Sequence, residues 1–306
     1  MPQWRLLPYA VLATGVLVVS TASILIRWGQ GAGVSSLTIA AVRLGVAAVL
    51  LLPVALLRSR SELARLNRRD CVLALTSGVF LAIHFWSWIS SLEYTSVASS
   101  TVLVTTNPLW VGLASLLLFR ERLQTSTLFG IGLTFAGTAL IFAADRTATG
   151  AGHADPLLGN CLALVGAVCA SGYLLIGRAL RGRVGLLTYI WLAYSSAAVL
   201  LAIAVVVSGQ RVLGFAPGAY ICLLLLAIGP QLTGHTAFNW SLRHLSATFV
   251  ALSILGEPVG SALLALAIFG ERLAPLQLGG FVLVLVGIFA AARGELRNPA
   301  ARDAAR

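Results

Sequence analysis

The feature that most constrains this chain is an internal duplication. Residues 84–143 recur as residues 234–293, shifted by 150 positions. The matched pairs include Asn107-Pro108 with Glu257-Pro258, Glu121-Arg122-Leu123 with Glu271-Arg272-Leu273, and Gly130 and Gly137 with Gly280 and Gly287. Both copies are strongly apolar, which indicates a duplicated membrane unit. Membrane proteins with two related halves are frequently transporters, because the halves can move around a shared central site.

The composition supports a bilayer protein rather than a soluble one. The chain of 306 residues is 58% hydrophobic and 10% charged, whereas soluble domains carry roughly 25% charged residues. Apolar stretches of about 20 residues can cross the hydrocarbon. The sequence predicts ten such spans, roughly 8–28, 34–57, 70–91, 95–119, 125–143, 157–180, 186–208, 217–241, 245–269 and 275–292. We therefore expect an all-α integral membrane protein with no room for a soluble catalytic domain.

The predicted spans also predict the topology. Each half, residues 8–143 and residues 157–292, has an odd number of spans, so the two halves should be inverted repeats. The basic residues are all arginines, and most fall on one side if both termini are cytoplasmic, as the positive-inside rule requires. The first span is too long for a signal peptide and should be retained. Residues 293–306 should form a polar cytoplasmic tail.

Two opposite charges lie within predicted spans and are the first candidates for function. Ionisable groups in the hydrocarbon are costly and often functional. Burial disfavours the charged form of a carboxylate, so Glu257 could take up a proton and couple it to transport. Alternatively, Glu257 forms a structural ion pair with Arg43, which lies at a similar depth. The two roles are compatible, because a gating pair could break when substrate or a proton binds.

Other polar and aromatic residues form stripes on the predicted helices. Gln231, His235 and Asn239 are spaced by four and share one helical face. A polar stripe of this kind, like His84 on another span, could donate hydrogen bonds to substrate or, through a histidine, relay protons. The alternative role is interhelical hydrogen bonding. The candidate substrate-binding residues are Arg43, His84, Trp88, Asn107, Trp110, Gln231, His235, Asn239 and Glu257. Pro108 and Pro258 are expected inside helices, where each would remove a backbone hydrogen bond of the helix. Such an interruption would lie either at a central cavity or at a packing kink.

Two further motifs favour structural roles. The glycines of each pair, Gly130/Gly137 and Gly280/Gly287, are seven residues apart and should allow close helix packing or, alternatively, form a dimer surface. Glu121 and Glu271 are expected to begin the last helix of each half, because acidic groups are favourable at a helix N-terminus.

The combined motifs resemble the drug/metabolite transporter superfamily, and most closely its EamA type. The segment Ser90–Ser100, Asn107-Pro108 and Glu121-Arg122-Leu123 carry the resemblance, and the second half carries corresponding marks. The resemblance covers essentially the whole chain. It implies two five-helix EamA repeats and an inner-membrane carrier, often an exporter of amino acids or other small metabolites.

Several other functions are less well supported. An intramembrane enzyme would need a nucleophile–base pair or metal ligands, and no HExxH or GxSxG motif is present. A non-transporting scaffold or sensor is a further alternative, as is a facilitative carrier without coupling. We expect no cofactor, no metal and no nucleic acid. The expected partners are the lipid bilayer and a small-molecule substrate, with the chain acting as a monomer or homodimer.

Overall fold

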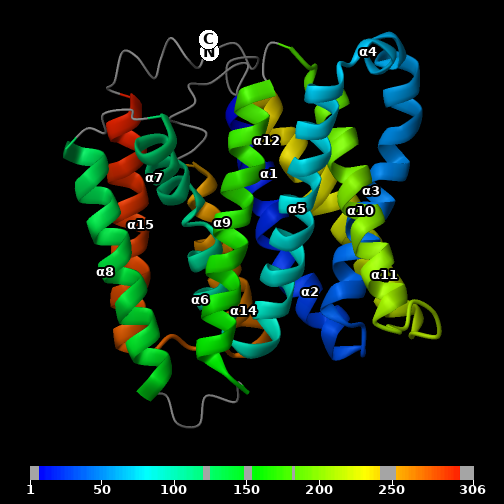
Figure 1. The fold of residues 1–306 in the computed structure, drawn as a ribbon. Coiled ribbons are helices and arrows are strands. Elements are labelled where there is room, and N and C mark those ends of the chain that lie inside the picture. Colours follow the sequence, from blue (N-terminus) through cyan, green and yellow to red (C-terminus); the bar gives the residue numbers. More distant parts are fainter. Residues whose placement is uncertain (1–6, 120–124, 148–153, 181–182, 242–252, 297–306) are drawn as a thin grey trace.

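The computed structural model describes residues 7–119, 125–147, 154–180, 183–241 and 253–296. The regular elements in these ranges are helices (Figure 1). They are α1 (Leu7–Ser20), α2 (Ala22–Gly31), α3 (Ser36–Arg58), α4 (Arg60–Arg65), α5 (Arg68–Tyr94), α6 (Val97–Val104), α7 (Asn107–Phe119), α8 (Thr125–Thr147), α9 (Pro156–Leu180), α10 (Leu186–Val207), α11 (Pro217–Leu226), η2 (Ala227–Gly234), α12 (His235–Ser241), α14 (Gly256–Phe269) and α15 (Pro275–Leu296). Helix α15 thus continues past residue 293, where the polar tail was expected to begin.

Length and apolarity make this a multi-pass membrane protein. Six helical stretches among the described residues are long and apolar enough to cross a bilayer. They are Leu7–Gly31, Ser36–Arg58, Arg68–Tyr94, Pro156–Leu180, Leu186–Val207 and Pro217–Phe238. Shorter apolar helices cover Leu128–Ala144, Gly256–Phe269 and Pro275–Ala290. Large apolar side chains such as Leu57 and Val207 are exposed, as expected of a surface that faces lipid.

Local sequence explains where several helices begin. The side chains of Ser35, Asn67 and Ser96 each accept a hydrogen bond from a backbone N–H in the first turn that follows. These N-caps satisfy donors that have no partner within the helix. They fix the starts of α3, α5 and α6, which carry or border the polar residues of the interior.

The two repeated prolines do not lie inside continuous helices, which corrects the sequence-based prediction. Pro108 is the second residue of α7, and Pro258 is the third residue of α14. A proline is tolerated in a first helical turn, because its missing N–H would have no partner there. The chain breaks before each proline: α6 ends at Val104, and a turn at Leu255 precedes α14.

A third proline has an effect that the sequence did not predict. Pro230 lies within the π-helix η2, which interrupts the helical stretch between α11 and α12. Proline cannot donate the hydrogen bond that an α-helix requires, and its ring clashes with the preceding turn. A wider turn relieves this conflict, and the Thr233 hydroxyl donates to the carbonyl of Ile228 within the same segment. Such π-helical segments often occur at functional sites.

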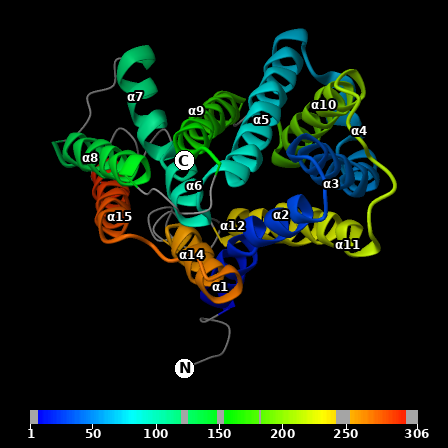
Figure 2. The same cartoon turned by 90° about the horizontal axis from the view of Figure 1, so that it is seen from below.

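Helix packing relates the two halves. Helix α5 packs along α9, and the corresponding elements with the halves exchanged, η2 and α12, pack along α1. Helices α3 and α10 pack together, as do α8 and α15. The α8–α15 pair stands on one side of the bundle, and α3, α10 and α11 stand on the other (Figure 2).

The glycine stripes account for the α8–α15 contact and confirm the packing prediction. A Cβ added at Gly137 would lie 2.6 Å from the carbonyl oxygen of Gly280, and one added at Gly287 would lie 2.7 Å from that of Gly130. The positions pair in opposite order, so the two helices are antiparallel. Small residues allow this close approach in a membrane.

Candidate functional site

Arg43 of α3 is the centre of the buried polar cluster. Its side chain is 1% exposed. Its Nε donates a 2.8 Å hydrogen bond to Oε1 of Gln231, which lies in η2. A charged group this deep needs compensating contacts, because burial of an unpaired charge is costly. Gln231, which supplies this contact, belongs to the other half of the chain.

Aromatic rings cover the guanidinium group of Arg43. Its Cζ lies 4.3 Å from the ring centroid of Phe85 and 5.7 Å from that of Trp88, both on α5. The negative face of an aromatic ring attracts a cation, and the attraction is stronger when water is excluded. Phe85 and Trp88 are 3% and 4% exposed, so these contacts lie in the interior. Trp88 was a predicted site residue, whereas Phe85 was not.

The elements of the second half complete the cluster. Gln231 follows Pro230 directly, so the π-helix positions the amide that holds Arg43. Tyr194 of α10 is buried and interacts with both Gln231 and Arg43. Tyr194 could not be identified from the sequence, because a tyrosine in an apolar span is indistinguishable from an interfacial or packing residue.

Glu257 is near Arg43 but does not form a close ion pair with it. The two side chains interact electrostatically. None of the ion pairs within 4.0 Å among the described residues joins them. Glu257 lies in the first turn of α14 and is partly buried. The hypothesis of an Arg43–Glu257 pair therefore meets a structure in which Gln231, not Glu257, is the hydrogen-bonding partner of Arg43.

The two predicted histidines lie beside this cluster. Nδ1 of His84 donates to the carbonyl of Gly166 at 2.8 Å, and its ring stacks on Trp88 with centroids 6.2 Å apart. This hydrogen bond joins α5 to α9, as the interhelical alternative for His84 predicts. His235, at the start of α12, contacts the Phe238 ring edge-on. Both histidines interact electrostatically with Arg43.

The remaining predicted residues lie elsewhere or outside the description. Trp110 donates from Nε1 to Thr106 and contacts the Phe135 ring of α8. The backbone carbonyl of Asn107 accepts a hydrogen bond from the Ser171 hydroxyl, which joins α7 to α9. The side chains of Pro108 and Asn239 lie outside the described part of the structure. The structure thus gathers Arg43, Trp88, Gln231, His84, His235 and Glu257, and it adds Phe85, Tyr194 and Pro230.

A second polar cluster, which we call the Arg27 clamp, joins the two halves at one end of the bundle. It consists of Arg27, Thr95, Val97 and Glu271. Nη2 of Arg27 contacts Oε1 of Glu271 at 2.8 Å and also donates to the carbonyl of Thr95. Oε2 of Glu271 accepts the backbone N–H of Val97, in the first turn of α6. The loop between α14 and α15, which carries Glu271, is at the end opposite α4 (Figure 1).

The clamp corrects the role expected for Glu271. Helix α15 begins at Pro275, so Glu271 precedes it. Its carboxylate instead interacts with the N-terminus of α6, where an acidic group is equally favourable. The corresponding residue of the first half, Glu121, lies outside the described residues.

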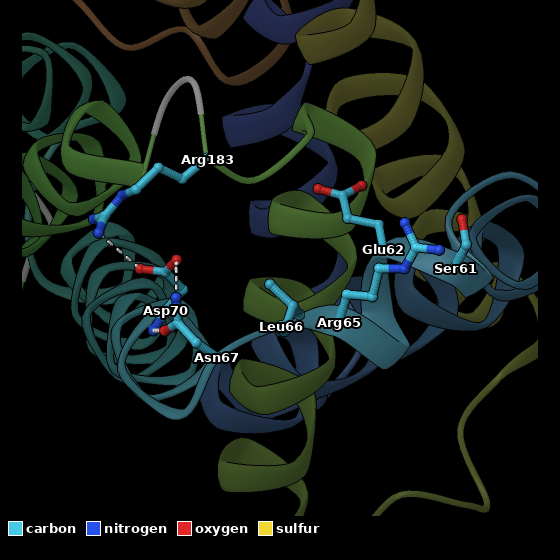
Figure 3. A pocket seen from close by; sticks show the side chains of 7 residues that line it. All are labelled: Ser61, Glu62, Arg65, Leu66, Asn67, Asp70 and Arg183. Carbon is cyan, nitrogen blue, oxygen red and sulfur yellow. Dashed lines mark hydrogen bonds and ion pairs between the residues drawn. The ribbon is translucent and has the colours of Figure 1, made fainter.

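At the α4 end, a cavity of about 510 Å³ lies where α4 and α5 meet the loop before α10 (Figure 3). It is lined by Ser61, Glu62, Arg65, Leu66, Asn67, Asp70 and Arg183. Glu62 accepts hydrogen bonds from Gly185 N and the Thr188 hydroxyl, and Asp70 pairs with Arg183 at 3.1 Å. Because both carboxylates are engaged in joining helices, we regard this cavity as a structural junction rather than the substrate site.

Known proteins are similar to this chain along most of its length. The model of the EamA-like transporter family matches residues 6–143 and 157–293. A protein of Clostridium kluyveri, described as an uncharacterized transporter, is 24% identical over 244 residues, which cover 79% of this chain and 78% of that protein. A solved crystal structure with 21% sequence identity has a TM-score of 0.63 and covers 93% of this chain and 96% of its own. The likeness to that structure concerns the fold.

Proposed function

Because this chain belongs to the EamA-like transporter family, we propose that it is a secondary carrier that exports a small metabolite, such as an amino acid, by alternating access. The observation that carries the proposal is the Arg43 cluster. Helices α3 and α5 of the first half supply Arg43, Phe85 and Trp88, and the second half supplies Gln231 and Tyr194. A buried charge held between two related halves is the arrangement expected of a central transport site.

We propose that the chain has ten membrane spans arranged as two inverted repeats. The protein would lie in the inner membrane, with both termini in the cytoplasm. The antiparallel α8–α15 pair supports inversion, because these are the last helices of the two halves. The exchanged packing of α5 on α9 and of η2 and α12 on α1 supports a two-fold relationship between the halves. The arginine-rich segment around α4 supports a cytoplasmic location for that end.

Proton coupling is the part of the proposal assigned to Glu257. Its carboxylate interacts electrostatically with Arg43 and lies in the first turn of the short apolar helix α14. Protonation would change the charge balance of the site and so the relative stability of its substrate-bound and substrate-free forms. The alternative is a facilitative carrier that equilibrates the metabolite without coupling. The response of flux to a pH gradient separates the two.

Transport by the purified protein tests this proposal. Liposomes that contain the protein are preloaded with an equimolar mixture of the proteinogenic amino acids, and the internal contents are followed by mass spectrometry. We expect a subset of the amino acids to leave faster than from liposomes without protein, and faster still when the outside is acidic. Accelerated efflux that ignores the pH gradient would support the facilitative alternative. If every amino acid left at the rate measured in liposomes without protein, amino acid transport would be contradicted.

We propose that the Arg27 clamp holds its end of the transporter closed. The Glu271→Gln substitution removes the ion pair and weakens the contact with the α6 N-terminus, contributions of about 1–3 kcal/mol together. This end should then open roughly tenfold more often. The measurement is the labelling rate of a single cysteine at Ser99, a residue of α6 that is 2% exposed, by a membrane-impermeant maleimide.

The matched control for this experiment is Arg272→Gln. Arg272 is the exposed neighbour of Glu271 in the same loop. Its neutralisation changes the local charge without breaking the clamp, so labelling at Ser99→Cys should stay at the parent rate. The four native cysteines are replaced by alanine in every variant. Equal labelling rates in the Glu271→Gln and Arg272→Gln proteins would show that the clamp does not control access.

A further inference from the structure

Two buried N–H donors in the Arg43 cluster have no hydrogen-bond acceptor among the residues that the structure describes. They are Nη1 of Arg43 and Nε1 of Trp88. Their residues are 1% and 4% exposed. Most buried polar groups in proteins are hydrogen-bonded, and an unpaired buried donor costs about 1–3 kcal/mol. Two such donors in one cluster therefore indicate a bond that is made in another state of the protein.

The side chains that carry the two donors are close to each other, and the donors share one chemical requirement. The guanidinium carbon of Arg43 is 5.7 Å from the Trp88 ring centroid, so a single small group can lie near both side chains. Guanidinium and indole N–H groups donate and cannot accept. Their partner must therefore be an acceptor, and beside Arg43 a negatively charged acceptor is favoured most.

We propose that Arg43 Nη1 and Trp88 Nε1 form the subsite for the carboxylate of the transported metabolite. This inference rests on the proposed transport function and adds the chemical class of its substrate, a small organic carboxylate. A carboxylate has two oxygens and can accept from both donors. Nε of Arg43 is already bound to Gln231, which fixes the guanidinium orientation and leaves Nη1 for the ligand.

The surroundings of the subsite exclude two alternatives. The carboxylate of Glu257 interacts electrostatically with Arg43, but it does not accept a hydrogen bond from Nη1. A cationic substrate would be repelled by Arg43 and would find no acceptor at Trp88 Nε1. The rings of Phe85 and Trp88 provide apolar surface for the remainder of a small carboxylate.

The test compares three probes of nearly the same shape. Thermal unfolding of the purified protein is measured with phenylacetate, phenylacetamide or 2-phenylethylammonium, at equal millimolar concentration and equal ionic strength. A ligand that binds the folded protein raises its unfolding temperature, and at equal concentration the tighter ligand raises it more. We expect stabilisation by phenylacetate alone. Equal stabilisation by the amide or the amine, or none by phenylacetate, would overturn the carboxylate subsite.

The Trp88→Phe substitution tests the role of the indole. It keeps an aromatic ring beside Arg43 and removes the five-membered ring with its unpaired N–H, so the unliganded protein should stay folded with a modest loss of packing stability. The apparent affinity for phenylacetate should fall about tenfold, as expected for a lost hydrogen bond to a charged group. The matched control is Trp86→Phe, on the same helix at a position that is 48% exposed, where the affinity should not change.

The outcomes also distinguish this inference from the proposed function. Parent affinity for phenylacetate in a folded Trp88→Phe protein would remove Trp88 from the subsite. Amino acid efflux from liposomes without any preference for phenylacetate over its amide would leave the carrier standing and overturn the subsite. Selective carboxylate binding without efflux of any amino acid would support the subsite and contradict the transport of amino acids.

Discussion

Replacing Glu257 with glutamine abolishes the response of transport to a pH gradient. Glutamine has nearly the same shape as glutamate but cannot bind and release a proton at this site. One pH unit is worth about 1.4 kcal/mol per proton, which corresponds to roughly a tenfold concentration ratio of substrate across the membrane. We expect the parent protein to approach this ratio in liposomes and the Glu257→Gln protein to stay near one.

The control for this prediction is Glu93→Gln. Glu93 is an exposed carboxylate near the end of α5 that contacts Ser36 rather than the Arg43 cluster. Its neutralisation should leave the pH response intact. Downhill exchange of substrate should persist in the Glu257→Gln protein, which shows that the fold and the site remain. A tenfold accumulation by Glu257→Gln would remove this residue as the coupling group.

The largest expected effect on stability comes from Gly137→Leu. A Cβ at this position would lie 2.6 Å from the backbone carbonyl of Gly280 and 2.8 Å from the backbone nitrogen of Val284. Backbone atoms cannot rotate away as a side chain can, so α8 and α15 must separate. Overpacking of this kind costs about 3 kcal/mol. We expect a clear fall in the unfolding temperature of the purified protein.

Gly132→Leu is the matched control for this substitution. Gly132 is also in α8, but an added Cβ there has no atom within 4 Å. The same change should therefore have little effect on the unfolding temperature, since the side chain enters lipid rather than a helix contact. Equal losses at positions 132 and 137 would contradict the α8–α15 contact as the cause, because replacing Gly with Leu favours the helix itself at both positions.

The sequence predicts the helices and the repeat well, because both are local or periodic properties. Six of the ten predicted spans correspond to described helical stretches long enough to cross a bilayer, whereas span 95–119 is divided into α6 and α7. The seven-residue spacing of Gly130 and Gly137 predicts close packing. The partner of that stripe depends on the tertiary fold. The structure shows that it is the stripe of the other half.

The sequence predicts the members of the central cluster only in part. Arg43 and Gln231 are conspicuous as polar residues in apolar spans, but they are far apart in sequence and their hydrogen bond appears only in the fold. Phe85 and Tyr194 resemble ordinary apolar-span aromatics. The effect of Pro230 depends on whether the chain accommodates it by a break or by a π-helix, and the energies of those two solutions are set by neighbouring helices.

The extracellular metabolite profile of intact cells tests the central claim most directly. Cells that produce the parent protein are compared with cells that produce Glu257→Gln at the same membrane level and with cells that produce neither. The proposed function predicts at least one small carboxylate-bearing metabolite that accumulates outside only with the parent protein. Identical profiles for all three kinds of cell would contradict export through a site that contains Glu257.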